Sequence, residues 1–261
     1  MKSWGWALAP LVAIALLLGI APHFGIGLRA GVFVVTVLLL AAELAVIGQL
    51  VNRRPTGAFI DNRNRISLSK FQAGAWTVLV LGALATAAAF NTLAPDNGTG
   101  YIAALAVQIP GELLLAMGIS ATSLVGTPML LSLKSDQSAL PQSAVDVAGD
   151  KLDNQGLDKS QISAKGHLLY KSNAAHARWA DLFTGEEVGN AGYPDLGKIQ
   201  QVLITLLLLG LYAAYVYSEL ARPTTLVVSS LPKLDQSFVW LLGISHATSL
   251  AYKAAPHTTT A

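Results

Sequence analysis

The sequence predicts an all-α integral membrane protein with about six transmembrane helices, a duplicated helical hairpin and one cytoplasmic loop region. Three observations lead to this fold class. Hydrophobic residues make up 53% of the 261-residue chain and charged residues only 12%, against roughly 25% charged residues in an average soluble domain. Long apolar stretches recur along the chain. Two pairs of these stretches carry the same short motifs, which indicates an internal repeat.

Six stretches are long and apolar enough to cross a bilayer, which takes about 20 residues per helix. We place them near residues 4–20, 30–51, 71–90, 113–133, 199–217 and 238–252. The first follows Lys2 and resembles a signal peptide, but Pro22-His23-Phe24 is a poor cleavage site, so we interpret it as a retained anchor. The last is the least apolar, because Ser245 and His246 interrupt it.

The basic residues are distributed unevenly between the two sides of these spans. Fourteen of the seventeen Lys and Arg residues fall on one side, and the other side has only Arg29, Arg222 and Lys233. Because cytoplasmic loops carry the excess of Lys and Arg, the first side is predicted to be cytoplasmic. Both termini then lie in the cytoplasm.

This topology divides the chain into five parts. In chain order they are a two-helix membrane anchor (1–52), a basic cytoplasmic loop (53–70), a first membrane hairpin (71–133), a cytoplasmic loop with a short amphipathic helix (134–198), and a second membrane hairpin with a short tail (199–261). The stretch from 135 to about 166 is polar and poor in large apolar residues. We therefore expect it to be mobile.

The two hairpins begin and end with related motifs. Residues 67–72 (SLSKFQ) precede the first hairpin and residues 195–200 (DLGKIQ) precede the second, while Gly-Ile-Ser recurs at 118–120 and 243–245. Both hairpins run in the same direction across the membrane, so they form a parallel repeat whose copies we expect to superpose.

The starts of the hairpins are predicted to be sharp helix N-termini. Ser67 and Asp195 occupy N-cap positions, where a side-chain oxygen accepts from a free backbone amide. Ser69 and Gln72 fit a capping box. The lysine in each motif, Lys70 or Lys198, is expected to reach the lipid headgroups.

The second half of the long loop contains a possible docking element. Residues 174–183 place Trp179, Leu182 and Phe183 on one face of a short helix. Docking onto the protein's own inner surface is the favoured interpretation. The inner leaflet and a partner protein are the alternatives.

Three polar residues in or beside the spans are candidates for an ion path. Glu43 lies within the second span, where an unpaired charge is costly, and either hydrogen bonds between helices or serves a proton or ion path. Glu112 follows Pro110-Gly111, which suits a carboxylate in the first turn of a helix; a ring at a pore mouth is the alternative. His246 is expected to be a hydrogen-bonded interior residue, because no metal-ligand partner stands at helical spacing.

Small residues recur every fourth position on two spans, which allows close helix packing in lipid. They predict either packing within the chain or an oligomer seam, at Gly118, Thr122, Gly126, Gly243, Ala247, Ala251 and Ala255.

Four arginines of the first cytoplasmic loop are candidates for binding anionic lipid headgroups: Arg53, Arg54, Arg63 and Arg65.

The sequence offers no recognisable chemistry. Cysteine is absent, which excludes disulfides and thiolate sites. We find no paired carboxylates within a span, no metal-ligand spacing, no phosphate loop, and no nucleophile beside a base. We therefore expect no catalytic residues, cofactor or metal, and no nucleic-acid partner. An intramembrane hydrolase built on Ser120 or Ser245 is a minor alternative.

Four stretches resemble a group of uncharacterised bacterial multi-spanning membrane proteins with repeated LSxxQ and LLGISAGT-like hairpins. They are residues 68–72, 117–122, 177–187 and 242–248. The resemblance covers the chain from about Arg53 onward, and it implies a bacterial inner membrane without implying an activity. We expect an anchor or scaffold subunit of a larger assembly, in contact with lipids and with itself or other subunits. An oligomeric ion-conducting pore is the alternative.

Overall fold

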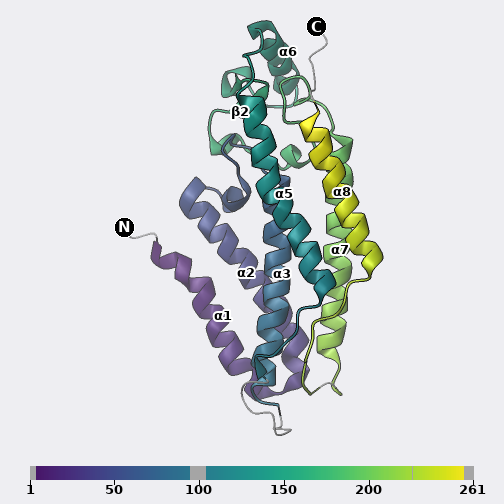
Figure 1. Cartoon of the computed structure of the whole chain (residues 1–261). Coiled ribbons are helices and arrows are strands. Elements are labelled where there is room, and N and C mark those ends of the chain that lie inside the picture. The colour runs from purple at the N-terminus through teal and green to yellow at the C-terminus, as the bar shows by residue number, and fades with distance from the viewer. Residues whose placement is uncertain (1–3, 95–103, 225, 256–261) are drawn as a thin grey trace.

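The fold is a bundle of long helices with a smaller folded layer at one end (Figure 1). The computed structural model describes residues 4–94, 104–224 and 226–255. Within these ranges the chain forms seven α-helices, several short 3-10 turns and one two-stranded hairpin. The layer at the end of the bundle comprises residues 136–195, and we call it the cap.

Within the described residues, five helices are long and apolar enough to cross a membrane, which agrees with the predicted all-α membrane class. They are α1 (Ala9–Ile20, extended at both ends by 3-10 turns), α2 (Arg29–Asn52), α3 (Leu68–Asn91), α5 (Gly111–Ser135) and α7 (Leu196–Ala221). The sixth, α8 (Gln236–Ala254), coincides with the last predicted span. Its polar residues leave it outside the group of five, so a sixth span remains a prediction.

Helices α3, α5, α7 and α8 form the centre of the molecule, and α2 packs against α3 and α7. The core between them contains Trp76, Leu113, Tyr212 and Leu242, each at most 2% exposed. The rings of Trp76 and Tyr212 lie 6.0 Å apart. Helix α1 diverges at the edge of the bundle (Figure 1), where it packs mainly on α2.

Two close contacts attach the N-terminal helices to the rest. After α2 the chain folds back on itself, and a Cβ atom on Gly48 would lie 2.8 Å from the backbone nitrogen of Gly57; only glycine permits this approach. At the other end of α2, Arg29 is fully buried and its Nε donates to the carbonyl of Leu220, 2.9 Å away. A cation at this place complements the negative end of the α7 dipole.

The predicted N-caps are confirmed. The Ser67 hydroxyl accepts from the backbone amide of Lys70, and the Asp195 carboxylate accepts from that of Lys198 at 3.1 Å. The predicted capping box is wrong. The side chain of Gln72 instead donates to Thr205 on α7, 2.6 Å away, because a fully buried amide needs a partner inside the bundle.

The arrangement of the hairpins is compatible with the proposed repeat. Helix α3 packs on α7 and α5 packs on α8, so each helix contacts its counterpart. The segments that precede α5 and α8 pair in parallel, through Gln108 N to Ser229 O (2.8 Å) and Leu231 N to Gln108 O (2.9 Å). Whether the two hairpins superpose stays a prediction.

The cap is more structured than we expected from its polar sequence. It contains α6 (Gln142–Asp153) and an antiparallel pair, β1 (Ile162–Lys165) and β2 (Leu168–Lys171). Its own core is small and consists of Leu152, Leu157, Leu169 and Ala191, with Ile162 against it. The expectation of a mobile loop is therefore wrong. Few large apolar residues suffice here because the cap also binds the bundle through charged groups.

Candidate functional site

The most unusual feature of the molecule is a cluster of buried charges where the cap meets the bundle. Glu186 and Glu187 project from the cap among the ends of three helices. The Glu186 carboxylate lies 2.9 Å from Lys198 of α7 and 3.5 Å from Lys253 of α8, and Glu187 lies 2.5 Å from Lys134 of α5. All five side chains are at most 10% exposed. We call these five residues the clasp.

A second group of buried charges continues from the clasp into the basic loop. Arg63 contacts Asp61 at 2.6 Å and Glu186 at 3.4 Å. Arg65 lies 3.8 Å from Asp181, which also accepts from Lys171 at 2.6 Å. These pairs join three segments that are far apart in the sequence: residues 61–65, strand β2, and the turn at Asp181.

The charge partners hold the acidic groups ionised. Burial alone would raise the pKa of Glu186, but Lys198, Lys253 and Arg63 together hold it well below its usual range. Burial also favours a raised pKa for Asp181, and Arg65 and Lys171 reverse this, so the pKa of Asp181 is lowered. Burial lowers the pKa of Lys171 to about 8, although Asp181 acts in the opposite direction.

The local sequence shapes the turn that carries the clasp glutamates. The backbone amide of Glu187 donates to the Asn190 side chain at 2.9 Å. A Cβ atom on Gly185 would lie only 2.1 Å from that same Asn190 oxygen, so no other residue fits there without moving it. The amide of Asp195 donates to Phe183 O at 2.7 Å and closes the turn directly before α7 begins.

No protein-family model, curated protein or solved structure matches this chain.

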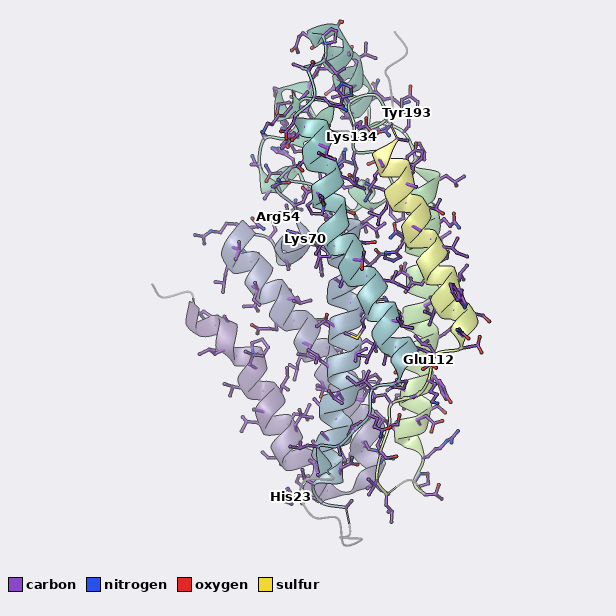
Figure 2. All side chains as sticks on the ribbon, in the orientation of Figure 1. His23, Arg54, Lys70, Glu112, Lys134 and Tyr193 are labelled. Atoms are coloured by element: carbon purple, nitrogen blue, oxygen red, sulfur yellow. The ribbon has the colours of Figure 1, made fainter. Side chains whose placement is uncertain are left out.

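Two of the four arginines predicted to bind lipid headgroups are buried instead. Arg63 and Arg65 are 3% and 2% exposed, because each has a carboxylate partner within the protein. Lys198 is buried in the clasp as well, so its predicted headgroup contact is wrong. Arg54 donates to three carbonyl oxygens of residues 174, 175 and 177, while Arg53 is exposed. Figure 2 shows Arg54 and Lys70 near the end of α2, beside the cap.

The predicted docking residues do not share one helical face. Residues 174–183 form two 3-10 turns, η6 (Ala174–His176) and η7 (Trp179–Leu182), rather than an α-helix. Leu182 is buried against Ile66 and other residues of the bundle end. Trp179 is 50% exposed and Phe183 38% exposed, and the Trp179 ring meets Phe71 edge to face at 6.0 Å. The segment thus docks on the protein's own surface and leaves two aromatic rings accessible.

The candidate ion-path residues lie in three separate places. Glu43 is 9% exposed within α2. Glu112 lies in the first turn of α5, at the end of that helix away from the cap (Figure 2), where a carboxylate complements the helix dipole. His246 is 3% exposed on α8, and its Nδ1 lies 2.5 Å from the Ser123 hydroxyl of α5. The structure does not bring the three together.

The contact of His246 belongs to a row of buried polar side chains between α5 and α8. Starting at the clasp, Lys253 donates to the Thr127 hydroxyl at 3.3 Å, and the Ser123–His246 pair follows about one turn further along. Ser120 and Ser245, both nearly fully buried, lie beyond it. The pairing of Ser123 with His246 was missed because the two residues are 123 positions apart.

The small-residue stripes contribute only in part to the α5–α8 contact. A Cβ atom on Gly126 would meet Leu250 at 3.6 Å, and one on Gly243 would meet Ile119 at the same distance. Gly118, Thr122, Ala247 and Ala251 are exposed. These four positions face away from the contact, so an oligomer seam at them stays a prediction.

We find no basis for a metal centre in the part of the chain that the structure describes, since no three His, Asp or Glu side chains there are grouped to hold an ion. The acidic residues of the clasp have lysine and arginine partners instead. Sequence reasoning missed the clasp. Its only visible signal was the Glu186-Glu187 pair shortly before the Asp195 cap, together with one lysine at the cap end of each hairpin helix.

Proposed function

We propose that this chain is a non-enzymatic anchor or scaffold subunit of a larger membrane assembly, in a bacterial inner membrane with both termini in the cytoplasm. The observation that carries the proposal is the clasp. Two glutamates of the cap bind lysines at the ends of α5, α7 and α8. A cap fixed to three helices at once is a rigid platform, and a rigid surface binds a partner with a smaller loss of conformational entropy.

The surface offered to a partner centres on Trp179. Its ring is half exposed and is held from behind by Phe71, which in turn contacts Phe59 at 5.6 Å. Tryptophan side chains that are fixed in place and partly accessible are typical of energetically dominant interface residues. Arg54, adjacent in the structure through its bonds to residues 174–177, supplies a positive rim.

Co-purification tests this proposal. The full chain is cross-linked in cells, purified in mild detergent, and its stoichiometric partners are identified. We expect Trp179→Ala to reduce the partner yield at least tenfold, while Trp240→Ala, which removes a more exposed ring from α8, leaves it unchanged. Equal partner yield from both variants contradicts a docking role for Trp179.

An oligomeric ion-conducting pore is the second candidate. The row of buried polar side chains between α5 and α8 favours it, because polar groups within a membrane bundle are often part of an ion or proton path. Reconstitution in planar bilayers separates the two functions. Steady cation currents that Glu43→Gln or Glu112→Gln abolishes support a pore and contradict a purely structural subunit.

The absence of enzymatic activity is part of the proposal, and one contact bears on it. Ser123 and His246 form a hydroxyl–imidazole pair at 2.5 Å, the arrangement used by serine nucleophiles. Both side chains are at most 3% exposed, so the Ser123 hydroxyl is not accessible to water or to a substrate. We expect no labelling of Ser123, Ser120 or Ser245 by a fluorophosphonate probe. Labelling that His246→Ala abolishes contradicts this expectation.

A further inference from the structure

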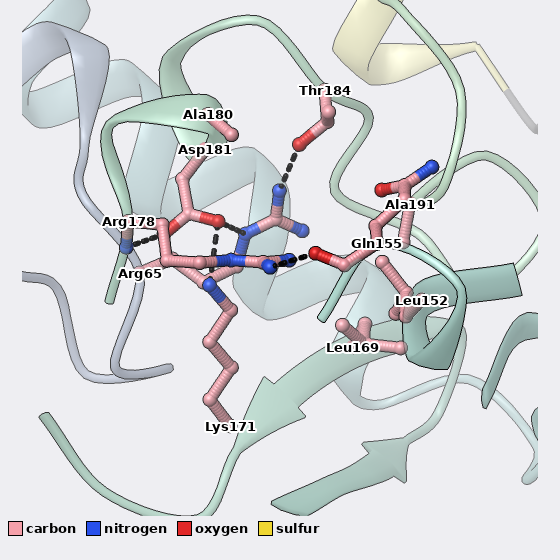
Figure 3. Close-up of a pocket in the computed structure, with 10 residues that line it drawn as sticks. All are labelled: Arg65, Leu152, Gln155, Leu169, Lys171, Arg178, Ala180, Asp181, Thr184 and Ala191. Carbon is pink, nitrogen blue, oxygen red and sulfur yellow. Dashed lines mark hydrogen bonds and ion pairs between the residues drawn. The ribbon is translucent and has the colours of Figure 1, made fainter. Parts of the chain in front are cut away.

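A small cavity lies inside the cap, between strand β2, helix α6 and the turn that contains Asp181 (Figure 3). Its polar lining comes from six residues: Arg65, Gln155, Lys171, Arg178, Asp181 and Thr184. The volume is about 10 Å³, which is room for one water molecule or an ion of similar size.

Two guanidinium groups of the cavity have donors without acceptors among the described residues. Arg65 is 2% exposed; its Nη2 donates to the Thr184 hydroxyl at 3.0 Å, while its Nη1 makes no hydrogen bond there. Arg178 donates from Nη1 to Gln155 O at 2.7 Å, and its buried Nε has no acceptor either. Figure 3 shows the two guanidinium groups near each other. Buried donors without an acceptor are rare and costly, so this pair indicates a missing acceptor.

The charge of the lining indicates which kind of acceptor is missing. Arg65, Lys171 and Arg178 bring three positive charges, and Asp181 brings one negative charge. Both carboxylate oxygens of Asp181 are already occupied. One accepts from Lys171 at 2.6 Å, and the other accepts from the backbone amides of Arg178 (2.9 Å) and Ile66 (3.2 Å). Neither of the two free donors makes a hydrogen bond to this carboxylate.

We propose that this cavity binds one small monatomic anion of the chloride class, held by Nη1 of Arg65 and Nε of Arg178. Its size excludes phosphate and carboxylate ligands, and two cationic donors favour an anion over water. The bound anion joins the basic loop to the turn that carries Trp179. The inference rests on the cavity alone and holds whether or not the cap docks a partner.

Equilibrium dialysis with radioactive chloride tests the inference on the purified full-length protein in detergent, in sodium gluconate at constant ionic strength. We expect one saturable chloride site per chain, with bromide competing. Arg178 is only partly buried, so Arg178→Gln is expected to fold and to weaken chloride binding at least tenfold. Arg53→Gln, which changes an exposed arginine directly after α2, is the matched control and should bind as the wild type does.

A thermal measurement provides an independent readout. A ligand that binds only the folded protein raises its melting temperature with concentration. Replacing gluconate by chloride should raise the melting temperature of the wild type and of Arg53→Gln, and should have no effect on Arg178→Gln. Absence of saturable chloride binding by the wild type, or equal binding by Arg178→Gln, overturns the proposal and leaves a water molecule in the cavity.

Discussion

Neutralising Glu186 should destabilise the protein strongly. Its carboxylate is 10% exposed and lies within 3.5 Å of three cations, Lys198, Lys253 and Arg63. Glu186→Gln keeps the size of the side chain and removes the charge, which leaves these cations without their shared counter-ion. Breaking a buried ion pair by removing one partner typically costs about 3–5 kcal/mol. We expect a loss of free energy of unfolding in that range, which is a large share of the stability of an ordinary domain.

Denaturation in mixed micelles, followed by tryptophan fluorescence, measures this loss. Asp150→Asn is the matched control, since it neutralises a carboxylate of the same cap whose ion pair with Lys159 is exposed; we expect it to unfold as the wild type does. The pKa of Glu186 is lowered in the fold, so its contribution is complete above the unfolded pKa of about 4.3 and disappears as pH falls through the folded value. A loss below about 1 kcal/mol for Glu186→Gln, the size typical of an exposed pair, refutes the reasoning.

Three further predictions concern other parts of the molecule. Burial lowers the pKa of Lys171 to about 8, so between about pH 8 and pH 10.4 the folded chain binds fewer protons than the unfolded chain. The free energy of unfolding of the wild type should therefore rise from pH 8 to pH 10, and that of Lys171→Met should rise less. Denaturation of both proteins at the two pH values measures this. Gly48→Ala should lower the free energy of unfolding by more than about 1 kcal/mol, because the added Cβ would lie 2.7–2.8 Å from backbone atoms. Gly31 has open space around it, so Gly31→Ala should leave stability unchanged or raise it in the same assay. Equal effects of the two substitutions contradict the close packing at Gly48. Alkaline-phosphatase fusions after residue 96, which lies outside the described residues, and after Pro223 should be active and one near Lys159 inactive; activity near Lys159 contradicts the predicted topology.

The sequence predicted the helices of the bundle well because their signals are local. Each apolar stretch is continuous, and the N-caps at Ser67 and Asp195 depend only on residues within one turn. The weakest predicted span, α8, is also the helix that falls short of the apolarity of the other five. Two of its buried polar residues, His246 and Lys253, have hydrogen-bond partners on α5 that no local pattern reveals.

The cap could not be predicted in the same way, because its stability depends on pairs that are far apart in the chain. Glu187 and Lys134 are 53 positions apart, and Lys253 lies further still from Glu186. Read locally, Arg63 and Arg65 looked like exposed headgroup ligands, although their carboxylate partners bury them. The polar composition of residues 135–166 suggested mobility for the same reason: the groups that fix the cap lie on other segments.

Hydrogen exchange of the cap's backbone amides tests most directly whether the cap is rigidly attached to the helix bundle. Three of the amides that connect its segments report on the cap: Leu169 donates to Glu186 O, Val188 to His167 O and Asp195 to Phe183 O. We predict that these amides exchange slowly in the purified wild-type protein, and much faster when Glu186 and Glu187 are both replaced by Gln. Rapid exchange of all three in the wild type would show a mobile loop and would contradict the account.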